Sequence, residues 1–223
     1  MILPQAFIFD GDGVVFDTEE LSILAFRRVA AQFGAVYTRE DCGRFIGCDT
    51  RVVLRLINDD HAIEIDPADY VSRRDNMYEQ CCAEANGPRA MPGAVETLDW
   101  LDAKGVPYAM ASSASPSKLR FNLERTGLLP RFPVHVNGDE VERGKPAPDI
   151  FLEAARRLGV DIGRCIVVED SINGLKGARA AGAAVIAIAG SHPLEELREH
   201  AELVFTSPIE MIAWLKTQCC EAG

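Results

Sequence analysis

Two aspartates separated by one glycine, Asp10 and Asp12, directly follow the short apolar run of residues 7–9. An apolar run of this kind is typical of a buried strand in a parallel sheet, and ligands bind just past the carboxyl ends of such strands. Two carboxylates in one site repel each other and retain a proton unless a cation neutralises them. The pair therefore predicts a metal site, an acid/base role, or both.

Two other interpretations of this stretch remain open at this point. Asp-Gly pairs are common in turns, so a loop that follows a strand by chance explains the motif equally well. A calcium loop of the EF-hand type is disfavoured, because the expected glutamate twelve positions along is absent and no helical pattern precedes the motif.

Polar groups also end two later strands. The apolar run 106–111 stops at Ser112 and Ser113, and the run 165–168 stops at Glu169 and Asp170. Because the carboxyl ends of parallel strands share one edge of a sheet, we expect these groups to converge on Asp10. Three strands that end in acids or hydroxyls indicate a site rather than a set of turns.

The convergent groups match the needs of phosphate chemistry. Several carboxylates suit a hard cation such as Mg²⁺, which takes oxygen ligands and shares them with substrate phosphate. Ser112 and Ser113, at the start of a predicted helix, offer hydrogen-bond donors to an anion. Lys145 lies between a glycine and a proline just before another predicted helix and provides a fixed positive charge. An aspartate can then act as the nucleophile, and a second carboxyl can transfer the proton.

The order of the predicted elements defines the fold class. Helical spacing dominates residues 18–87, whereas strands and helices alternate from about residue 88 onward. We therefore expect an α/β protein with a doubly wound parallel sheet and an inserted small α-helical cap. Residues 1–17 and 88–223 would form the α/β core domain, and residues 18–87 the cap domain.

Composition narrows the function classes. The chain has 223 residues and a formal net charge of −11, which argues against nucleic acid or an anionic membrane as partner. The start of the chain lacks the basic and apolar segments of a signal peptide, and the apolar stretch 180–190 is too short to span a bilayer. The seven cysteines follow neither a disulfide nor a zinc-ligand pattern. We expect a cytoplasmic protein; its oligomeric state is open.

Four short motifs, in the order in which they occur along the chain, resemble those of the haloacid dehalogenase superfamily. They are the segment 9–14 around Asp10, then Ser112, then Lys145 with Pro146, then Glu169 with Asp170. The segment 17–19, the helical insert and the segment 144–151 resemble the branch of β-phosphoglucomutase-like phosphatases with a helical cap. The resemblance implies a Rossmann-like core and a Mg²⁺-dependent phosphatase that forms an aspartyl-phosphate.

The resemblance also implies a role for each site residue. Asp10 would be the nucleophile and a Mg²⁺ ligand, and Asp12 would be the general acid/base with its carbonyl on the metal. Glu169 and Asp170 would complete the metal site. The remaining predicted groups would bind the phosphoryl group: Ser112, Ser113 and Lys145. Members that resemble dehalogenases or phosphonatases lack an acid at the position of Asp12, so its presence favours phosphate esters.

The cap carries the substrate prediction. Mutase-like members have a histidine where this chain has Ser22. They also have an arginine in the cap loop, and Arg51 of this chain is displaced from that position by one residue. Both departures favour a phosphatase that acts on a small phosphorylated metabolite, with sugar phosphates as the preferred class. Arg51 and Arg74 are candidates for holding the substrate, although either could equally be a solvated helix residue. A sugar phosphomutase and a non-catalytic phosphometabolite-binding protein are the alternatives.

Overall fold

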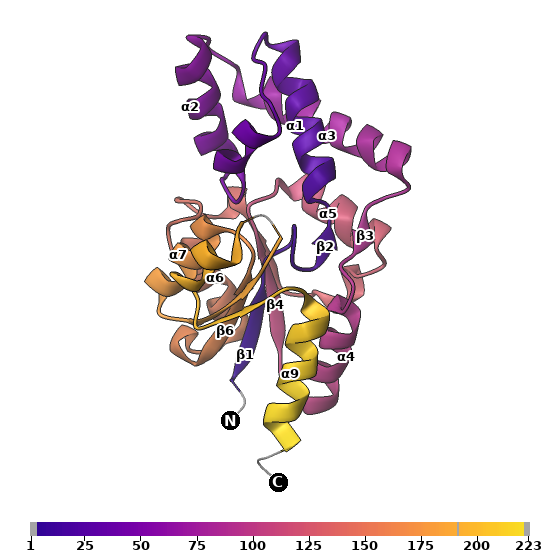
Figure 1. The fold of residues 1–223 in the computed structure, drawn as a ribbon, viewed down its shortest axis with the longest axis vertical. Helices are drawn as coiled ribbons and strands as arrows, with labels where there is room; N and C mark the ends of the chain where they lie inside the picture. Colours follow the sequence, from indigo (N-terminus) through magenta and orange to yellow (C-terminus); the bar gives the residue numbers. More distant parts are fainter. Residues whose placement is uncertain (1–3, 191, 221–223) are drawn as a thin grey trace.

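The computed structural model describes residues 4–190 and 192–220. Its centre is a six-stranded sheet in the order β5-β4-β1-β6-β7-β8, in which every neighbouring pair is parallel. The strands are β1 (Ala6–Phe9), β4 (Tyr108–Ser112), β5 (His135–Asn137), β6 (Cys165–Glu169), β7 (Ala184–Ile188) and β8 (Leu203–Phe205). The first strand of the chain is thus central, and the sheet grows outward from it in both directions (Figure 1).

Helices cover both faces of this sheet. Phe7 and Phe9 of β1 belong to the same apolar cluster as α4 (Ala94–Lys104), α5 (Pro116–Arg125) and α9 (Pro208–Cys220). The alternate residues Ala6 and Ile8 pack with the opposite layer, which contains α6 (Asp149–Leu158), α7 (Ile172–Ala181) and α8 (Leu194–Arg198). Successive strand residues point to opposite faces, so one strand serves both cores. The predicted doubly wound α/β fold is confirmed.

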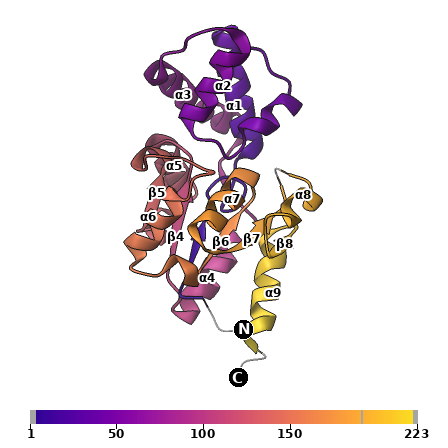
Figure 2. The same cartoon turned by 90° about the vertical axis from the view of Figure 1, so that its left-hand side faces the viewer.

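The inserted segment is built from helices joined by loops. It contains α1 (Glu19–Gln32), the 3-10 helix η1 (Glu40–Phe45), α2 (Thr50–His61) and α3 (Pro67–Ala85). Side-chain caps begin two of these helices: Asp49 accepts from the amide of Val52 at 2.9 Å, and Asp66 precedes Pro67 in the first turn of α3. These helices enclose an apolar cluster of their own and lie above the carboxyl ends of the strands (Figure 2).

The chain enters and leaves this helical segment through a small ladder that the sequence pattern did not predict. Strands β2 (Phe16–Asp17) and β3 (Arg89–Ala90) form an antiparallel pair, which brings the two crossings side by side. Two-residue strands are too short to leave a periodic signal. The domain boundaries at residues 17/18 and 87/88 remain a prediction, and the ladder lies at that position.

The remaining elements are short connectors. They are the 3-10 helices η2 (Leu129–Arg131), η3 (Gly138–Glu140) and η4 (Ile162–Arg164). Among residues 4–190 and 192–220, no helix combines the length and apolarity that crossing a lipid bilayer requires. Five described cysteines are free thiols: Cys42, Cys48, Cys81, Cys82 and Cys165.

Candidate active site

The strand order places a crevice between β1 and β6. From β1 the chain builds the sheet outward through β4 and β5, and then returns to the other side of β1 with β6. In open α/β sheets this reversal of direction marks the ligand site, because neighbouring connections leave in opposite directions there. Asp10 follows Phe9, which is in register with Met110 of β4 and Val168 of β6. The predicted strand ends therefore meet at one point.

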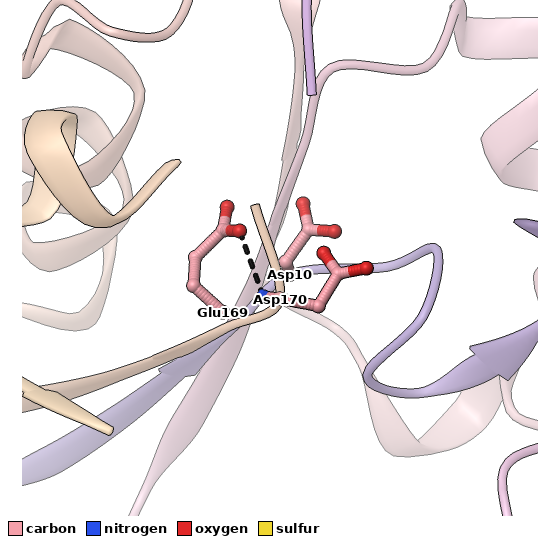
Figure 3. A group of neighbouring side chains, drawn as sticks. All are labelled: Asp10, Glu169 and Asp170. Atoms are coloured by element: carbon pink, nitrogen blue, oxygen red, sulfur yellow. Dashed lines mark hydrogen bonds between the residues drawn. The ribbon is translucent and has the colours of Figure 1, made fainter. Parts of the chain in front are cut away.

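Three carboxylates from these ends form a buried acidic cluster (Figure 3). One oxygen of each of Asp10, Glu169 and Asp170 lies within 4.8 Å of the others. Their residues are 7%, 0% and 4% exposed. Buried carboxylates at this separation are costly without a compensating cation.

Lys145 provides part of that compensation. Its ammonium group donates to Oδ1 of Asp10 at 2.5 Å, to Oε1 of Glu169 at 2.6 Å and to the carbonyl of Ala111 at 3.0 Å. Burial acts to lower the pKa of Lys145, but the carboxylates of Asp10 and Glu169 outweigh it and raise the pKa. The lysine therefore remains a fixed positive charge at neutral pH.

The cluster still carries excess negative charge. Burial raises the pKa of Asp10 to about 7, and the carboxylate of Glu169 acts in the same direction against the attraction of Lys145. An all-oxygen donor set with unmet positive charge fits a hard divalent cation. The predicted divalent-metal site thus matches the residues present.

Glu169 also holds the loop that carries Asp170. Its Oε2 accepts from the amides of Asp170 at 3.0 Å and Ser171 at 3.1 Å, and from the hydroxyl of Ser171 at 3.0 Å. Across the cluster, a Cβ on Gly13 would lie 2.1 Å from Oδ2 of Asp170, and Gly13 has a φ of +77°. Both observations require glycine at position 13, which lets the first loop approach Asp170 closely.

Asp12 lies outside this acidic cluster, in a different electrostatic environment. Its Oδ2 accepts from the ammonium of Lys118 at 2.7 Å, and its Oδ1 accepts from the hydroxyl of Thr18. Burial acts to raise the pKa of Asp12, but Lys118 and Thr18 outweigh it and lower the pKa. The two aspartates that looked alike in the sequence therefore have opposite pKa shifts. The contact of Asp12 with metal through its carbonyl stays a prediction.

Lys118 and Thr18 are site residues that the sequence reasoning missed. Lys118 lies in the first turn of α5 and also donates to the hydroxyl of Ser22 at 2.9 Å. A lysine in the first turn of a helix interacts unfavourably with the helix dipole. This position could have indicated from the sequence that Lys118 has a role outside the helix.

The two predicted phosphate-binding serines lie at the same edge, but in different surroundings. Ser112 is buried and its hydroxyl accepts from the amide of Ala114 at 3.2 Å. Ser113 donates to the carbonyl of Gly47 at 3.1 Å, so it joins the core to the loop before α2. Both serines line the cavity described below.

The two candidate cap arginines are placed differently. Arg74 lines the cavity and donates to Thr50 at 2.8 Å and to its neighbour Asp75 at 2.9 Å. The exposed Arg51 donates to the carbonyl of Glu142 at 2.7 Å and to Asp49 at 3.1 Å, and it is not among the cavity-lining residues. The structure thus brings one of the two to the site.

A cavity of about 160 Å³ joins the core edge to the helical segment. Asp10, Asp12 and Asp170 line its floor, and residues of α1, η1, α2 and α3 line its roof. A small ligand in this cavity would contact the acidic cluster and the helical segment at once.

Comparison with known proteins places this geometry in a family. Residues 7–188 match the family described as "Haloacid dehalogenase-like hydrolase". The chain is 34% identical over 178 residues to "Phosphorylated carbohydrates phosphatase" of Thermotoga maritima, covering 80% of this chain and 82% of that protein. The structure of CbbY from Rhodobacter sphaeroides in complex with phosphate is 26% identical, with a TM-score of 0.82 over 94% of this chain and 96% of that one.

Two longer relatives come from Arabidopsis thaliana. The chain is 36% identical over 186 residues to "Protein SUPPRESSOR OF QUENCHING 1, chloroplastic" and 29% identical over 210 residues to "Bifunctional riboflavin kinase/FMN phosphatase". These matches cover 82% and 94% of this chain, but only 18% and 55% of the relatives' lengths. The match of residues 7–188 and the identity to the Thermotoga protein confirm the predicted membership: this chain belongs to the haloacid dehalogenase-like hydrolase family.

Proposed function

We propose that this chain hydrolyses phosphate monoesters of small phosphorylated metabolites with the help of Mg²⁺, through an aspartyl-phosphate on Asp10. The contrast between Asp10 and Asp12 carries the proposal. The carboxylate of Asp10 lies beside Lys145 in an acidic cluster that could bind a cation. The carboxylate of Asp12 lies outside this cluster and binds Lys118. The Thermotoga relative, named for phosphorylated carbohydrates, and the phosphate complex of the structural relative support this class of substrate.

The residues that would hold Mg²⁺ are Asp10, Glu169 and Asp170 through their carboxylates, and Asp12 through its carbonyl. When bound, the ion would neutralise the charge of the transferring phosphoryl group. The remaining chemistry belongs to the protein side chains.

Asp10 attacks phosphorus through a carboxylate oxygen, and the bond between phosphorus and the leaving alcohol breaks. Asp12 gives its proton to the departing oxygen, which leaves an aspartyl-phosphate and a free alcohol. Asp12 then takes a proton from a water molecule that attacks phosphorus, so that phosphate leaves and Asp10 is restored. Lys145, Ser112 and Ser113 would stabilise the phosphoryl oxygens during both steps.

The proton transfer requires Asp12 to change its charge state. In the arrangement described, Lys118 and Thr18 lower its pKa and favour the ionised form, which suits the second step. A dianionic phosphoryl group beside Asp12 raises its proton affinity, because like charges disfavour ionisation. Substrate binding would therefore supply the protonated form that the first step needs.

The helical segment 18–87 would act as a cap domain over a core of residues 1–17 and 88–223. The hydrogen bond from Ser113 to Gly47 supports this role, because it ties a core residue at the site to the cap loop. Cap closure would exclude water and position the leaving group. Sugar phosphates are the class that the sequence favours, with Arg74 as a cap contact and Arg51 as the weaker candidate.

The direct test is phosphate release from a panel of phosphorylated metabolites, measured with Mg²⁺ and again with EDTA. We expect Asp10→Asn to lose activity by a factor on the order of 10⁴ or more on every substrate while keeping the thermal unfolding of the parent. Asp59→Asn, an exposed change on α2, is the matched control. Appreciable activity in Asp10→Asn would contradict the nucleophile, and release of an isomer in place of phosphate would favour the mutase.

A further inference from the structure

The roof of the active-site cavity is largely apolar. We call its apolar part the cap wall and define it by the aliphatic and aromatic side chains that line the cavity from the helical segment: Ile23, Phe26, Phe45, Ile46, Val53 and Tyr70. The thiol-bearing residues Cys42 and Cys48 line the same side. Burying an apolar ligand surface against such a wall is favourable, whereas burying hydroxyls there is not unless each finds a partner.

The polar side chains that line the cavity from the helical segment are Glu19, Ser22 and Arg74, and each already interacts with the protein. Ser22 donates to the carbonyl of Thr18 at 2.8 Å and accepts from Lys118 at 2.9 Å. The guanidinium of Arg74 donates to Thr50 and Asp75. A leaving group with several hydroxyls would have to displace these bonds or leave its own unmade, and either loses affinity.

Tyr70 is the exception on the cap wall. The residue is 0% exposed, and its hydroxyl is the one buried side-chain polar atom without a partner in residues 4–190 and 192–220. Burial raises the pKa of Tyr70 to about 12, so at neutral pH the hydroxyl keeps its proton and is a donor. A buried donor without an acceptor is costly, and a ligand acceptor would remove that cost.

Arg74 lies one helical turn after Tyr70 on α3. Its guanidinium carbon is 5.9 Å from the centre of the Tyr70 ring, and its side chain is 16% exposed. Three of its five N–H groups donate to Thr50 and Asp75, which leaves two for a ligand acceptor. Because residues four apart on a helix share a face, those donors and the Tyr70 hydroxyl lie on the same side of α3. A carboxylate or carbonyl oxygen is the partner that suits both.

The size of the cavity limits what fits beside the phosphoryl group. An engineered apolar cavity of about 150 Å³ accommodates one benzene molecule. The 160 Å³ cavity must hold a phosphoryl group as well as the leaving group. A ring and a phosphoryl group together already exceed this volume, so a single ring or a short chain would extend through the open side of the cavity and a larger leaving group would lie mostly outside it.

We propose that the substrate is a phosphate monoester whose leaving group is one apolar ring or short chain with a carboxylate or carbonyl acceptor, and that Tyr70 and Arg74 bind that acceptor. The proposal rests on the phosphatase function, and it replaces the sugar phosphates that the sequence favours with a less hydroxylated class of substrate. It also separates this chain from relatives that act on polyhydroxylated leaving groups, because burying apolar ligand surface against the cap wall is favourable and burying unpaired hydroxyls there is not.

The test compares esters of primary alcohols, so that the leaving groups have similar intrinsic reactivity. The probes are 4-carboxybenzyl phosphate, benzyl phosphate and glucose 6-phosphate, each assayed for phosphate release by the whole protein with Mg²⁺. We expect kcat/KM to decrease in that order, with at least about a tenfold difference between the first and the last. A preference for glucose 6-phosphate would overturn the inference and leave the phosphatase function standing. Hydrolysis of none of the three would overturn the inference alone, whereas full activity in Asp10→Asn, or no phosphate release from the whole metabolite panel, would overturn the phosphatase function as well.

Tyr70→Phe separates a binding role from a structural one. We expect kcat/KM for 4-carboxybenzyl phosphate to fall by about 10-fold or more, that for benzyl phosphate to change by less than about 2-fold, and the unfolding temperature to stay or rise. The control is Tyr78→Phe, because the hydroxyl of the equally buried Tyr78 donates to Asn122 at 2.8 Å. That variant should unfold earlier and should not discriminate between the two esters. An equal loss on both esters in Tyr70→Phe, or a lower unfolding temperature, would overturn the role of Tyr70.

Discussion

The two sides of the active-site cavity differ in chemical character. The core edge, which we define as Asp10, Lys145, Glu169 and Asp170, consists of buried charges that pair within the protein. Two of its members, Asp10 and Asp170, line the cavity. The cap wall consists of apolar side chains and one hydroxyl that has no partner in the described chain. The core edge is thus suited to charges that change during a reaction, and the cap wall is suited to burying the apolar surface of a ligand.

This difference indicates a division of labour between the two sides. A preorganised set of charges stabilises the phosphoryl group whatever alcohol it is attached to. An apolar wall distinguishes leaving groups by shape and by the acceptors they carry. Changes at the core edge should therefore affect all substrates alike, and changes at the cap wall should affect some substrates more than others.

The largest effect is expected for Lys145→Met. It removes the cation between the buried carboxylates of Asp10 and Glu169, and breaking a buried ion pair in this way typically costs about 3–5 kcal/mol of unfolding free energy. We expect this loss in denaturant unfolding, together with loss of activity on every ester. Added Mg²⁺ should restore part of the stability, because a cation in the acidic cluster replaces part of the missing charge.

The matched control is Lys104→Met, which changes an exposed lysine at the end of α4. It should leave unfolding and activity close to the parent. Parent-like stability in Lys145→Met, or a loss that depends on the leaving group, would contradict the description of the core edge.

The core edge is also the part of the site that the sequence predicts best. Its residues follow apolar runs, and the rule that parallel strands share one edge converts their positions along the chain into proximity in space. Asp10, Glu169 and Asp170 could thus be assembled without coordinates.

The cap wall could not be predicted in the same way. Phe26, Phe45 and Tyr70 belong to three different helices, and helical periodicity indicates that each is buried without indicating which cavity it lines. The partners of Asp12 were missed for a related reason, because Lys118 is 106 residues away and no strand end marks it. Pairings between segments that are far apart in the sequence depend on packing that a local pattern does not contain.

An intermediate effect is expected for Lys118→Met, which tests the contrast between Asp12 and Asp10. Without the ammonium, burial dominates and the pKa of Asp12 rises, so the pH–rate profile should shift toward higher pH. General acid/base groups contribute about 10²–10⁴-fold, and we expect a loss of about 10–100-fold from misplacing this one. The measurement is the pH dependence of kcat for benzyl phosphate.

Lys118→Arg keeps a cation at the site and should retain more activity than Lys118→Met. 4-Nitrophenyl phosphate has a leaving group that needs little protonation, so its hydrolysis should be less sensitive to the change. Equal losses on the two esters with an unchanged pH profile would show that Lys118 acts on the fold instead of on Asp12.

The smallest effect is expected for Arg51→Ala, which tests whether Arg74 is the cap arginine that binds the leaving group. The Arg51 side chain is 56% exposed and binds Asp49 and the carbonyl of Glu142, and an exposed pair of this kind contributes about 1 kcal/mol or less. We expect kcat/KM to stay within about 2-fold of the parent for 4-carboxybenzyl and benzyl phosphate alike. Arg74→Gln should lower kcat/KM for the carboxylated ester selectively, because Arg74 lines the cavity and Arg51 does not. A selective loss in Arg51→Ala instead would move the acceptor-binding region from α3 to the first turn of α2, and would return Arg51 to the set of substrate contacts.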